Sequence, residues 1–162
     1  MSFFPQKEWQ TVTVTVDFTD GTWNTVNTHE LFTVTGAVDV LLSNRCLTSM
    51  TDAADGGMIS LGVETDPDLL ITSTSFDGMA MGIDAGRFWF SNTTQASDAF
   101  PPTTGMAPQN GAIIPRSIIG LDIGYEITVE AATGGVIEFV CMWRPSNGVG
   151  SGSVVAGAGG AL

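Results

Sequence analysis

The single histidine of the chain, His29, is followed directly by Glu30, and an imidazole next to a carboxylate is a common arrangement in general acid–base catalysis. That chemistry also needs a nucleophile within reach and a group that orients the imidazole. If a strand has begun at His29, adjacent side chains point to opposite faces, and no serine lies in a G-x-S-x-G turn. We therefore interpret His29 as a structural residue at a turn or strand end. We expect His29→Ala to leave function intact and to cost little stability.

Pairs of acidic residues are the second candidate, because two carboxylates can hydrolyse a glycosidic bond or help to bind calcium. The pairs are Asp17/Asp20, Asp52/Asp55, Asp66/Asp68 and Glu126/Glu130. Aspartate is common in turns, where its side chain bonds to nearby backbone, and no complete D-x-D-x-D-G loop is present. We interpret these pairs as turn residues, with a calcium site as the alternative. The sequence predicts no catalytic residue, no bound cofactor and no metal site.

Aromatic residues could form a platform on which a sugar stacks. The candidates are Trp9, Trp23, Trp89 and Trp143, together with Phe88 and Phe90. Alternation in "RFWFSN" places Trp89 on the opposite face from Phe88 and Phe90, so one side belongs to the core. We interpret these residues as core and subunit contacts, with carbohydrate binding as the alternative.

Two further observations concern chemistry and partners. Cys46 and Cys141 have no metal-type spacing and lie in strand-like runs, so we expect buried, reduced thiols. The formal net charge is −12, and the chain has only five basic residues, which are dispersed; this composition argues against nucleic-acid binding.

The composition fits a protein that is covered by copies or partners. The 162 residues suffice for one domain with a real core, but only 14% of them are charged and Lys7 is the only lysine. Soluble monomers usually cover their surface with mixed charge. The start of the chain lacks the pattern of a secretory signal, and no apolar run is long enough for a membrane helix, so we expect no membrane association and assembly in a cytoplasm.

Period-two alternation dominates the chain and predicts an all-β fold. In "TVTVTVDF" (11–18) the valines and Phe18 share one face, and in "ELFTVTGAVDVLL" (30–42) Gly36 interrupts the pattern as a bulge or bend would. The intervening "TDGT" (19–22) has the composition of a hairpin turn. Further strands are expected in 57–64, 69–75, 87–92, 112–120, 125–131 and 135–145. Eight or nine short strands predict an antiparallel β-sandwich or jelly roll with extended termini.

The expected domain organisation is an N-terminal arm (1–10), a β-sandwich domain (11–145) and a C-terminal arm (146–162) of linker-like Gly/Ser/Ala composition. The polar, Pro-rich stretch 92–111 is longer than an ordinary loop. The arms offer apolar anchors for a neighbouring subunit, and we predict interface roles for Phe3, Phe4, Val154, Val155 and Leu162. The alternative is that these residues fold back on their own domain.

Four blocks, "ELFTVTGAVDVLL", "ISLGVETD", "GIDAGRFW" and "GVIEFVCMWRP", occur in this order within residues 30–145, and the chain ends in "VVAGAGGAL". In this order they resemble small structural proteins of tailed bacteriophages. The resemblance implies a non-enzymatic virion component, a decoration (cement) protein on the capsid surface. It also implies the major capsid protein and copies of the chain as partners, with a homotrimer as the oligomer. No functional residue is transferred, because the group has no catalytic motif.

Other classes of function stay open at this point. One is a receptor- or glycan-binding fibre or adhesin module that uses loop 92–111 and its aromatic residues. A tail or connector component of the virion is another. A glycan hydrolase built on paired acids is the enzymatic alternative, and we expect no such activity.

Overall fold

The computed structural model describes residues 8–54, 56–76, 88–90, 116–146 and 152–162, and within these ranges it contains strands and no α-helix. The strands are β1 (Gln10–Asp17), β2 (Thr28–Thr35), β3 (Ala37–Thr51), β4 (Met58–Val63), β5 (Asp66–Ser75), β6 (Phe88–Phe90), β7 (Arg116–Ile119), β8 (Ile123–Thr128), β9 (Gly134–Pro145) and β10 (Ser153–Ala156). The predicted all-β class is confirmed. Phe3, Phe4 and the stretch 92–111 lie outside the described residues.

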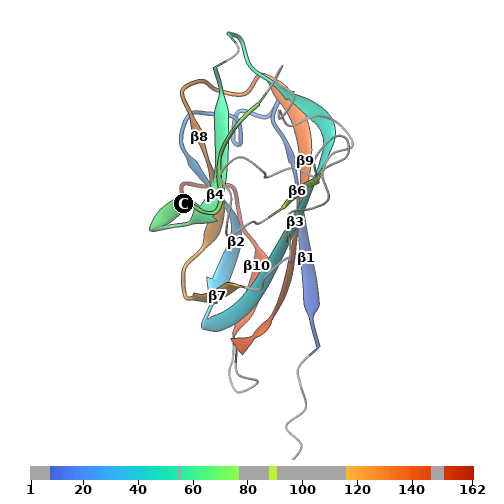
Figure 1. Ribbon diagram of the computed structural model, residues 1–162, viewed down its shortest axis with the longest axis vertical. Coiled ribbons are helices and arrows are strands. Elements are labelled where there is room, and N and C mark those ends of the chain that lie inside the picture. Colours follow the sequence, from blue (N-terminus) through green and yellow to red (C-terminus); the bar gives the residue numbers. More distant parts are fainter. Residues whose placement is uncertain (1–7, 55, 77–87, 91–115, 147–151) are drawn as a thin grey trace, which may run out of the picture.

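The strands form two antiparallel sheets, consistent with a β-sandwich (Figure 1). Sheet A has the order β1-β9-β3-β6, with β7 also paired to β3, and sheet B has the order β10-β2-β8-β4-β5. The description therefore includes ten strands where the sequence predicted eight or nine. The additional strand is β10, which lies in the segment that we expected to be a C-terminal arm.

One set of pairings is nested along the chain, and the further pairings of β3 with β9 and of β4 with β8 complete the sheets. β4 pairs with β5, β3 pairs with β6 and β7, β2 pairs with β8, and β1 pairs with β9. The chain thus resembles one long hairpin whose two arms run side by side while they pass repeatedly between the sheets. Of the described strands, only β10 lies outside this nesting, because it pairs with the far edge of β2.

The predicted inward faces of the strands are confirmed. Val16 and Phe18 are buried at the end of β1, and Val38 and Val40 begin a buried series that continues along β3. β9 alternates between buried and half-buried positions over its whole length. Because side chains alternate between the two faces of a strand, the buried series lies between the sheets and the other series faces outward.

Tyr125, the largest of the fully buried side chains described, is the centre of an aromatic group between the sheets. Its ring stacks on Phe139 with centroids 5.8 Å apart and contacts Phe18 at 5.6 Å. The hydroxyl donates a hydrogen bond to the carbonyl oxygen of Trp23 at 2.5 Å, and burial raises the pKa of the phenol. A buried tyrosine needs such a partner for its hydroxyl, and this bond fixes the loop that carries Trp23.

Gly36 forms the corner at which the chain passes from sheet B to sheet A. It separates β2 from β3 and has a φ of 68°, a conformation that glycine adopts without steric cost. The predicted bend at this residue is confirmed.

The expectation of a hairpin turn at 19–22 is wrong. β1 lies in sheet A and β2 in sheet B, so residues 18–27 cross between the sheets. The two-residue hairpin turns favoured by Asp-Gly need a positive φ at glycine, and Gly21 has none. Phe18, with 0% exposure, directs the chain into the interior immediately after β1, and the adjacent acids bond to local turns instead.

Candidate interaction surface

The outward face of sheet A combines hydroxyl and apolar side chains. The register aligns Thr11 of β1 with Met142 of β9, and Met142 with Leu41 of β3. In the next outward row, Thr13 is aligned with Val140. The two threonines are exposed, whereas Leu41, Val140 and Met142 are half-buried. These two rows contain no charged side chain, so another protein that covers them does not have to desolvate a charge there.

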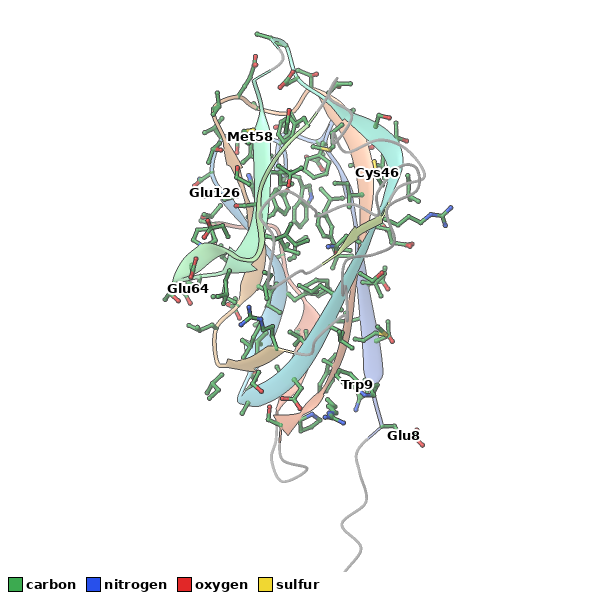
Figure 2. All side chains as sticks on the ribbon, in the orientation of Figure 1. Glu8, Trp9, Cys46, Met58, Glu64 and Glu126 are labelled. Carbon is green, nitrogen blue, oxygen red and sulfur yellow. The ribbon has the colours of Figure 1, made fainter. Side chains whose placement is uncertain are left out.

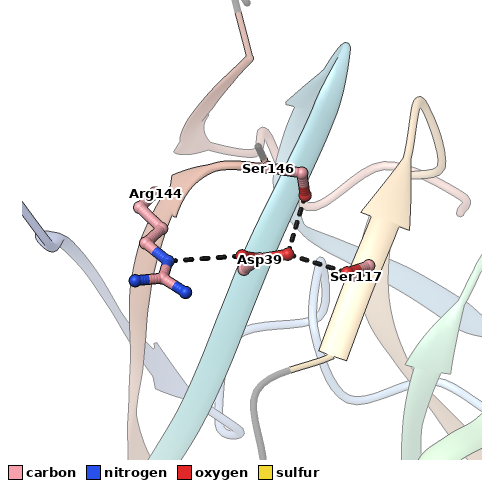
Figure 3. A network of polar contacts seen from close by, with 4 residues as sticks. All are labelled: Asp39, Ser117, Arg144 and Ser146. Carbon is pink, nitrogen blue, oxygen red and sulfur yellow. Dashed lines mark hydrogen bonds and ion pairs between the residues drawn. The ribbon is translucent and has the colours of Figure 1, made fainter. Parts of the chain in front are cut away.

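A polar network lies at one end of this face (Figure 3). Asp39 of β3 accepts hydrogen bonds from the hydroxyls of Ser117 and Ser146, each at 2.7 Å, and from Nε of Arg144 at 3.2 Å. Desolvation raises the pKa of Asp39, but these three donors and the charge of Arg144 outweigh it, so the pKa lies below its usual value. The network ties β3 to β7 and to the end of β9.

Trp9 extends the same network toward the start of β1. The guanidinium of Arg144 lies over the Trp9 ring, 4.8 Å from its centroid, and the ring is 38% exposed. Figure 2 shows Trp9 beside Glu8, just before the start of β1. The described members of the network include no histidine or cysteine. The Asp39 carboxylate is the only group among them that could act as a base toward a hydroxyl. The geometry of the network fits a role in holding strands together.

The charges are segregated between the two sheets. All three arginines of the described residues, Arg45, Arg116 and Arg144, lie on strands of sheet A. The same sheet carries three acids, Asp17, Asp39 and Glu138, so its strands are close to neutral.

Sheet B, in contrast, is purely acidic within its described strands, which carry Glu30, Asp66, Asp68 and Glu126 and no arginine or lysine. Figure 2 shows Glu64 and Glu126 on the outer side of this sheet. A hydrogen bond with Asp68 and the charge of that residue raise the pKa of Asp66. This direction is the sign of like charges that are held close together. Among the described strands, those of sheet B thus carry a net negative charge, whereas those of sheet A are balanced.

His29 is a buried structural residue, at 3% exposure near the start of β2. Its Nε2 lies 2.9 Å from the carbonyl oxygen of Thr25, and its ring stacks on Tyr125 with centroids 4.9 Å apart. Glu30 instead accepts a hydrogen bond from the hydroxyl of Thr33. Strand alternation predicted that the imidazole and the carboxylate point to opposite faces. The structure agrees, because His29 and Glu30 have different partners.

The acids of the first pair are turn residues, as predicted. Asp17 accepts hydrogen bonds from the backbone N–H of Thr19 at 2.9 Å and from its hydroxyl at 2.7 Å, and these bonds lower the pKa of Asp17. Asp20 accepts the backbone N–H of Thr22 at 2.9 Å. Both carboxylates satisfy backbone donors in the sheet-crossing loop.

The other pairs are divided between turns and surface. Asp52 accepts the N–H of Gly57, and Glu130 accepts the N–H of Ala54 at 3.1 Å, so these acids bridge neighbouring loops. Asp55, the predicted companion of Asp52, lies outside the described residues. Among the described residues no group of three or more His, Cys, Asp or Glu side chains is arranged to hold a metal ion.

The four tryptophans do not form a single described platform. Trp143 is 7% exposed and faces the interior, Trp23 is half-buried against Tyr125, and Trp9 lies on the outer side beside Arg144. Trp89 lies on β6, whose backbone pairs with β3 at Asn44. Trp23 and Trp143 thus pack in the interior, whereas Trp9 lies on the outer side.

Cys46 and Cys141 are buried free thiols, as expected from their strand-like surroundings. They occupy inward positions of β3 and β9. Burial raises the pKa of Cys141 to about 12, which keeps this thiol protonated and unreactive at neutral pH.

The C-terminal residues fold onto their own domain, which was the alternative to a free arm. Val154 is 4% exposed, belongs to the core and is aligned with Val34 of β2. Val155 is 54% exposed on the outer side of β10, and Leu162 lies close to Gly124 of β8. Of the predicted C-terminal anchors, Val155 is thus the one with most of its surface free, whereas Val154 is already covered by its own chain.

Gly157 and Gly159 pack tightly against the domain, although the composition of the last residues resembles a linker. Gly157 donates its N–H to the carbonyl oxygen of Leu31 at 2.8 Å. Gly159 has a φ of 77°, and a Cβ at this position would lie only 2.6 Å from the ring of Trp23. The N–H of Glu30 donates to the carbonyl oxygen of Gly160 at 2.9 Å. The absence of side chains is what lets this segment lie directly on the sandwich.

Neither the Asp39 network nor the charge segregation was predicted from the sequence, because both depend on which strands become neighbours. The period-two pattern alone places Asp39 and Arg144 at outward positions of their strands. It does not show that the two residues are neighbours. No helix within the described residues is long and apolar enough to cross a membrane. The chain matches no family model, no curated protein and no solved structure.

Proposed function

We propose that the chain is a non-enzymatic virion protein that decorates the surface of a bacteriophage capsid and stabilises it by bridging neighbouring subunits. The sequence blocks that resemble small structural phage proteins support this role. The structural observation that carries it is the contrast between a nearly neutral sheet A and an acidic sheet B. This contrast suits a protein that binds a large assembly through its neutral side and exposes its acidic side to solvent.

The proposed fold is a jelly roll with two additional strands. In a jelly roll, a long hairpin is wound into two sheets, and the nested pairing of β1 with β9, β2 with β8, β3 with β6 and β4 with β5 supports that winding. On this reading β7 and β10 are additions to an eight-stranded framework. Jelly rolls occur in viral capsid domains and also in lectins, so the fold is compatible with a virion role without specifying one.

The proposed orientation places the outward face of sheet A against the capsid. Leu41, Val140 and Met142 provide apolar area there, and the charges of Asp39 and Arg144 on this face already form an ion pair with each other. Covering a paired charge avoids leaving an isolated buried ion. The acids of sheet B then face solvent and limit association between decorated particles.

The proposed partners are the major capsid protein and copies of the chain. Phe3 and Phe4 are proposed to anchor the N-terminal arm, and Val155 is proposed as the accessible C-terminal contact. A trimer is proposed on the resemblance alone. The proposal requires no cofactor.

The deciding experiment compares binding of two variants to undecorated capsids. Met142→Glu adds an acid to the outward face of sheet A, and Thr128→Glu adds one to the outward face of sheet B, each at a half-buried position. We expect the first variant to lose binding and the second to bind like the wild type, with circular dichroism showing that both fold. Wild-type binding by Met142→Glu would contradict the orientation, and labelling of intact particles that finds the protein away from the capsid surface would contradict the function.

A second candidate is a glycan- or receptor-binding module, favoured by the 38% exposed ring of Trp9 beside Arg144. Glycan-array binding that is lost in Trp9→Ala would support it. The absence of binding to any glycan would leave decoration as the better account.

A further inference from the structure

One edge of sheet A has backbone groups that no described strand pairs with. β1 is aligned with β9 from Gln10 to Asp17 without a shift in register. Just beyond the strand, the N–H of Phe18 donates to the carbonyl oxygen of Gly135 at 2.9 Å, so Phe18 directs its backbone groups toward β9. In an antiparallel ladder the N–H and C=O of one residue point the same way and alternate along the strand. Thr11, Thr13 and Thr15 therefore direct theirs to the open side.

The sequence and pairing of β1 lack three of the features that usually prevent an edge strand from pairing with another molecule. Natural edges are protected by proline, charged side chains, bulges or covering segments. β5, which forms an edge of sheet B, has Pro67 between Asp66 and Asp68, and its register with β4 shifts twice. The sequence of β1, QTVTVTVD, has no proline, no bulge in its pairing and no charge before Asp17.

The interior of the sandwich is also incompletely covered along this edge. Val12 and Val14 share the inward face of β1 with Val16 and pack against the core. Val16 is 0% exposed, whereas Val12 and Val14 are only half-buried. A further strand beside β1 would remove the remaining apolar surface of these two valines from water.

The sequence of β1 is complementary to itself, and this identifies the occupant as a second copy of the chain. In an antiparallel pair centred on Thr13, Thr11 of each copy lies opposite Thr15 of the other, and Val12 lies opposite Val14. Threonines then meet on the outward face and valines on the inward face, which are favourable cross-strand pairs.

Charge favours the same occupant. Asp17 is the only charged residue of β1, and in this register the two copies of Asp17 lie at opposite ends of the ribbon. The pairing also leaves the acidic sheet B of each copy away from the shared edge. A partner edge rich in acids would lack this separation.

We propose that β1 pairs antiparallel with β1 of a second copy, so that sheet A continues through a two-fold dimer. A two-fold contact uses the same patch on both copies and is the most common way in which proteins form dimers. The contact concerns the isolated chain and does not rest on the proposed capsid role. It competes with the trimer that the sequence resemblance implies, and the measured mass distinguishes them.

The first test is sedimentation equilibrium of the isolated protein at micromolar concentration. We expect twice the mass of the chain for the wild type and for Thr13→Val, which keeps the backbone donor and the strand propensity. Thr13→Pro removes an N–H that faces the open edge and takes no part in the ladder with β9, and Thr13→Lys adds the charge that natural edges use. Both should sediment as folded monomers, while Thr22→Lys, with the same charge change in the exposed loop, should stay dimeric.

The second test examines the register. Thr13 lies opposite its own copy, where the spacing of paired strands suits a disulfide. Thr13→Cys should therefore give covalent dimers on mild oxidation, and Thr15→Cys, which lies opposite Thr11, should not. The native cysteines are buried and do not compete.

Several outcomes would overturn the proposal. These are a monomeric wild type, a mass of three copies, a dimer that persists in both Thr13→Pro and Thr13→Lys, or equal crosslinking of the two cysteine variants. Should Thr13→Pro fail to fold, Thr13→Lys still decides the question. Loss of capsid binding in Met142→Glu is measured separately, so the two proposals fail independently.

Discussion

Val129 is a β-branched residue in a backbone conformation that such residues rarely adopt. Its φ is 70°, and the N–H of Glu130 donates to the carbonyl oxygen of Thr128 at 2.8 Å, which closes a tight turn around it. The side chain is 75% exposed, so it gains little from burial in return.

Val129→Gly should therefore increase the free energy of unfolding by about 1 kcal/mol, since relief of strain exceeds the added freedom of the unfolded chain. Chemical denaturation measures the change. Val26→Gly is the matched control, because Val26 is also exposed but has an ordinary φ, and it should bring no gain. A Val129→Gly protein less stable than the wild type would contradict the assignment of strain.

His29 should contribute more to stability than the sequence indicated. Its burial, its stacking on Tyr125 and its bond to Thr25 mean that His29→Ala leaves a cavity and an unpaired carbonyl group. We expect a loss of about 2 kcal/mol in the free energy of unfolding, with capsid binding of the folded protein unchanged. His29→Phe keeps the ring and should lose less. A neutral His29→Ala would restore the original expectation of little cost.

At the scale of elements, the C-terminal segment depends on close contact between backbone and side chains. Gly159 has a positive φ and touches the ring of Trp23, whereas a Cβ on Gly160 would meet nothing within 4 Å. Gly159→Ala should therefore lower the free energy of unfolding by about 1–2 kcal/mol, and Gly160→Ala should be close to neutral. Thermal and chemical unfolding of the two variants measure the difference. Equal effects would mean that the segment does not dock as described.

The Asp39 network should make the junction of β3, β7 and β9 sensitive to pH. The folded-state pKa of Asp39 lies below the unfolded value, so its contribution is present above the unfolded pKa of about 4 and is lost as pH falls through the folded pKa. Asp39→Asn should lower stability by about 1 kcal/mol at neutral pH, a modest figure because the network is partly solvated, and by less at low pH.

Asp68→Asn is the control for this prediction. It removes a like charge from the neighbourhood of Asp66 and should not destabilise the protein at neutral pH. Denaturation curves at pH 7 and pH 3 test both variants. An Asp39→Asn defect that does not shrink in acid would show that the carboxylate charge is not what stabilises the junction.

At the scale of the whole molecule, the excess of acidic over basic residues opposes folding through self-repulsion. The net charge is −12, and the described strands of sheet B carry no cation. Added sodium chloride screens exposed charges over about 10 Å at 0.1 M, so moderate salt should raise the midpoint of thermal unfolding. A fall in the midpoint with salt would indicate that favourable ion pairs outweigh the repulsion.

Alternation along single strands made much of this architecture predictable. Val38 and Val40 were assigned to the core because the period of two is a local property of the chain. β10 was missed because its few residues lie in a Gly/Ser/Ala-rich context, and their strand conformation is set by the partner β2. The contact between Arg144 and Asp39 could not be predicted from the sequence, since it arises only through the pairing of β9 with β3. The charge segregation could not be predicted either, because it depends on which strands join which sheet.

The nested pairing of the strands has a consequence for the order in which the chain can fold. β4 and β5 are close in sequence and can pair early, whereas β1 must wait for β9, which lies far along the chain and is made much later. Pairings so distant in sequence carry a high loop-closure cost and make folding slow. During that interval both edges of β1 are free, so a newly made chain passes through a stage in which "TVTVTV" can join a neighbouring chain on either side. Yield during expression should accordingly depend on chain concentration and temperature more steeply than the stability of the finished protein does.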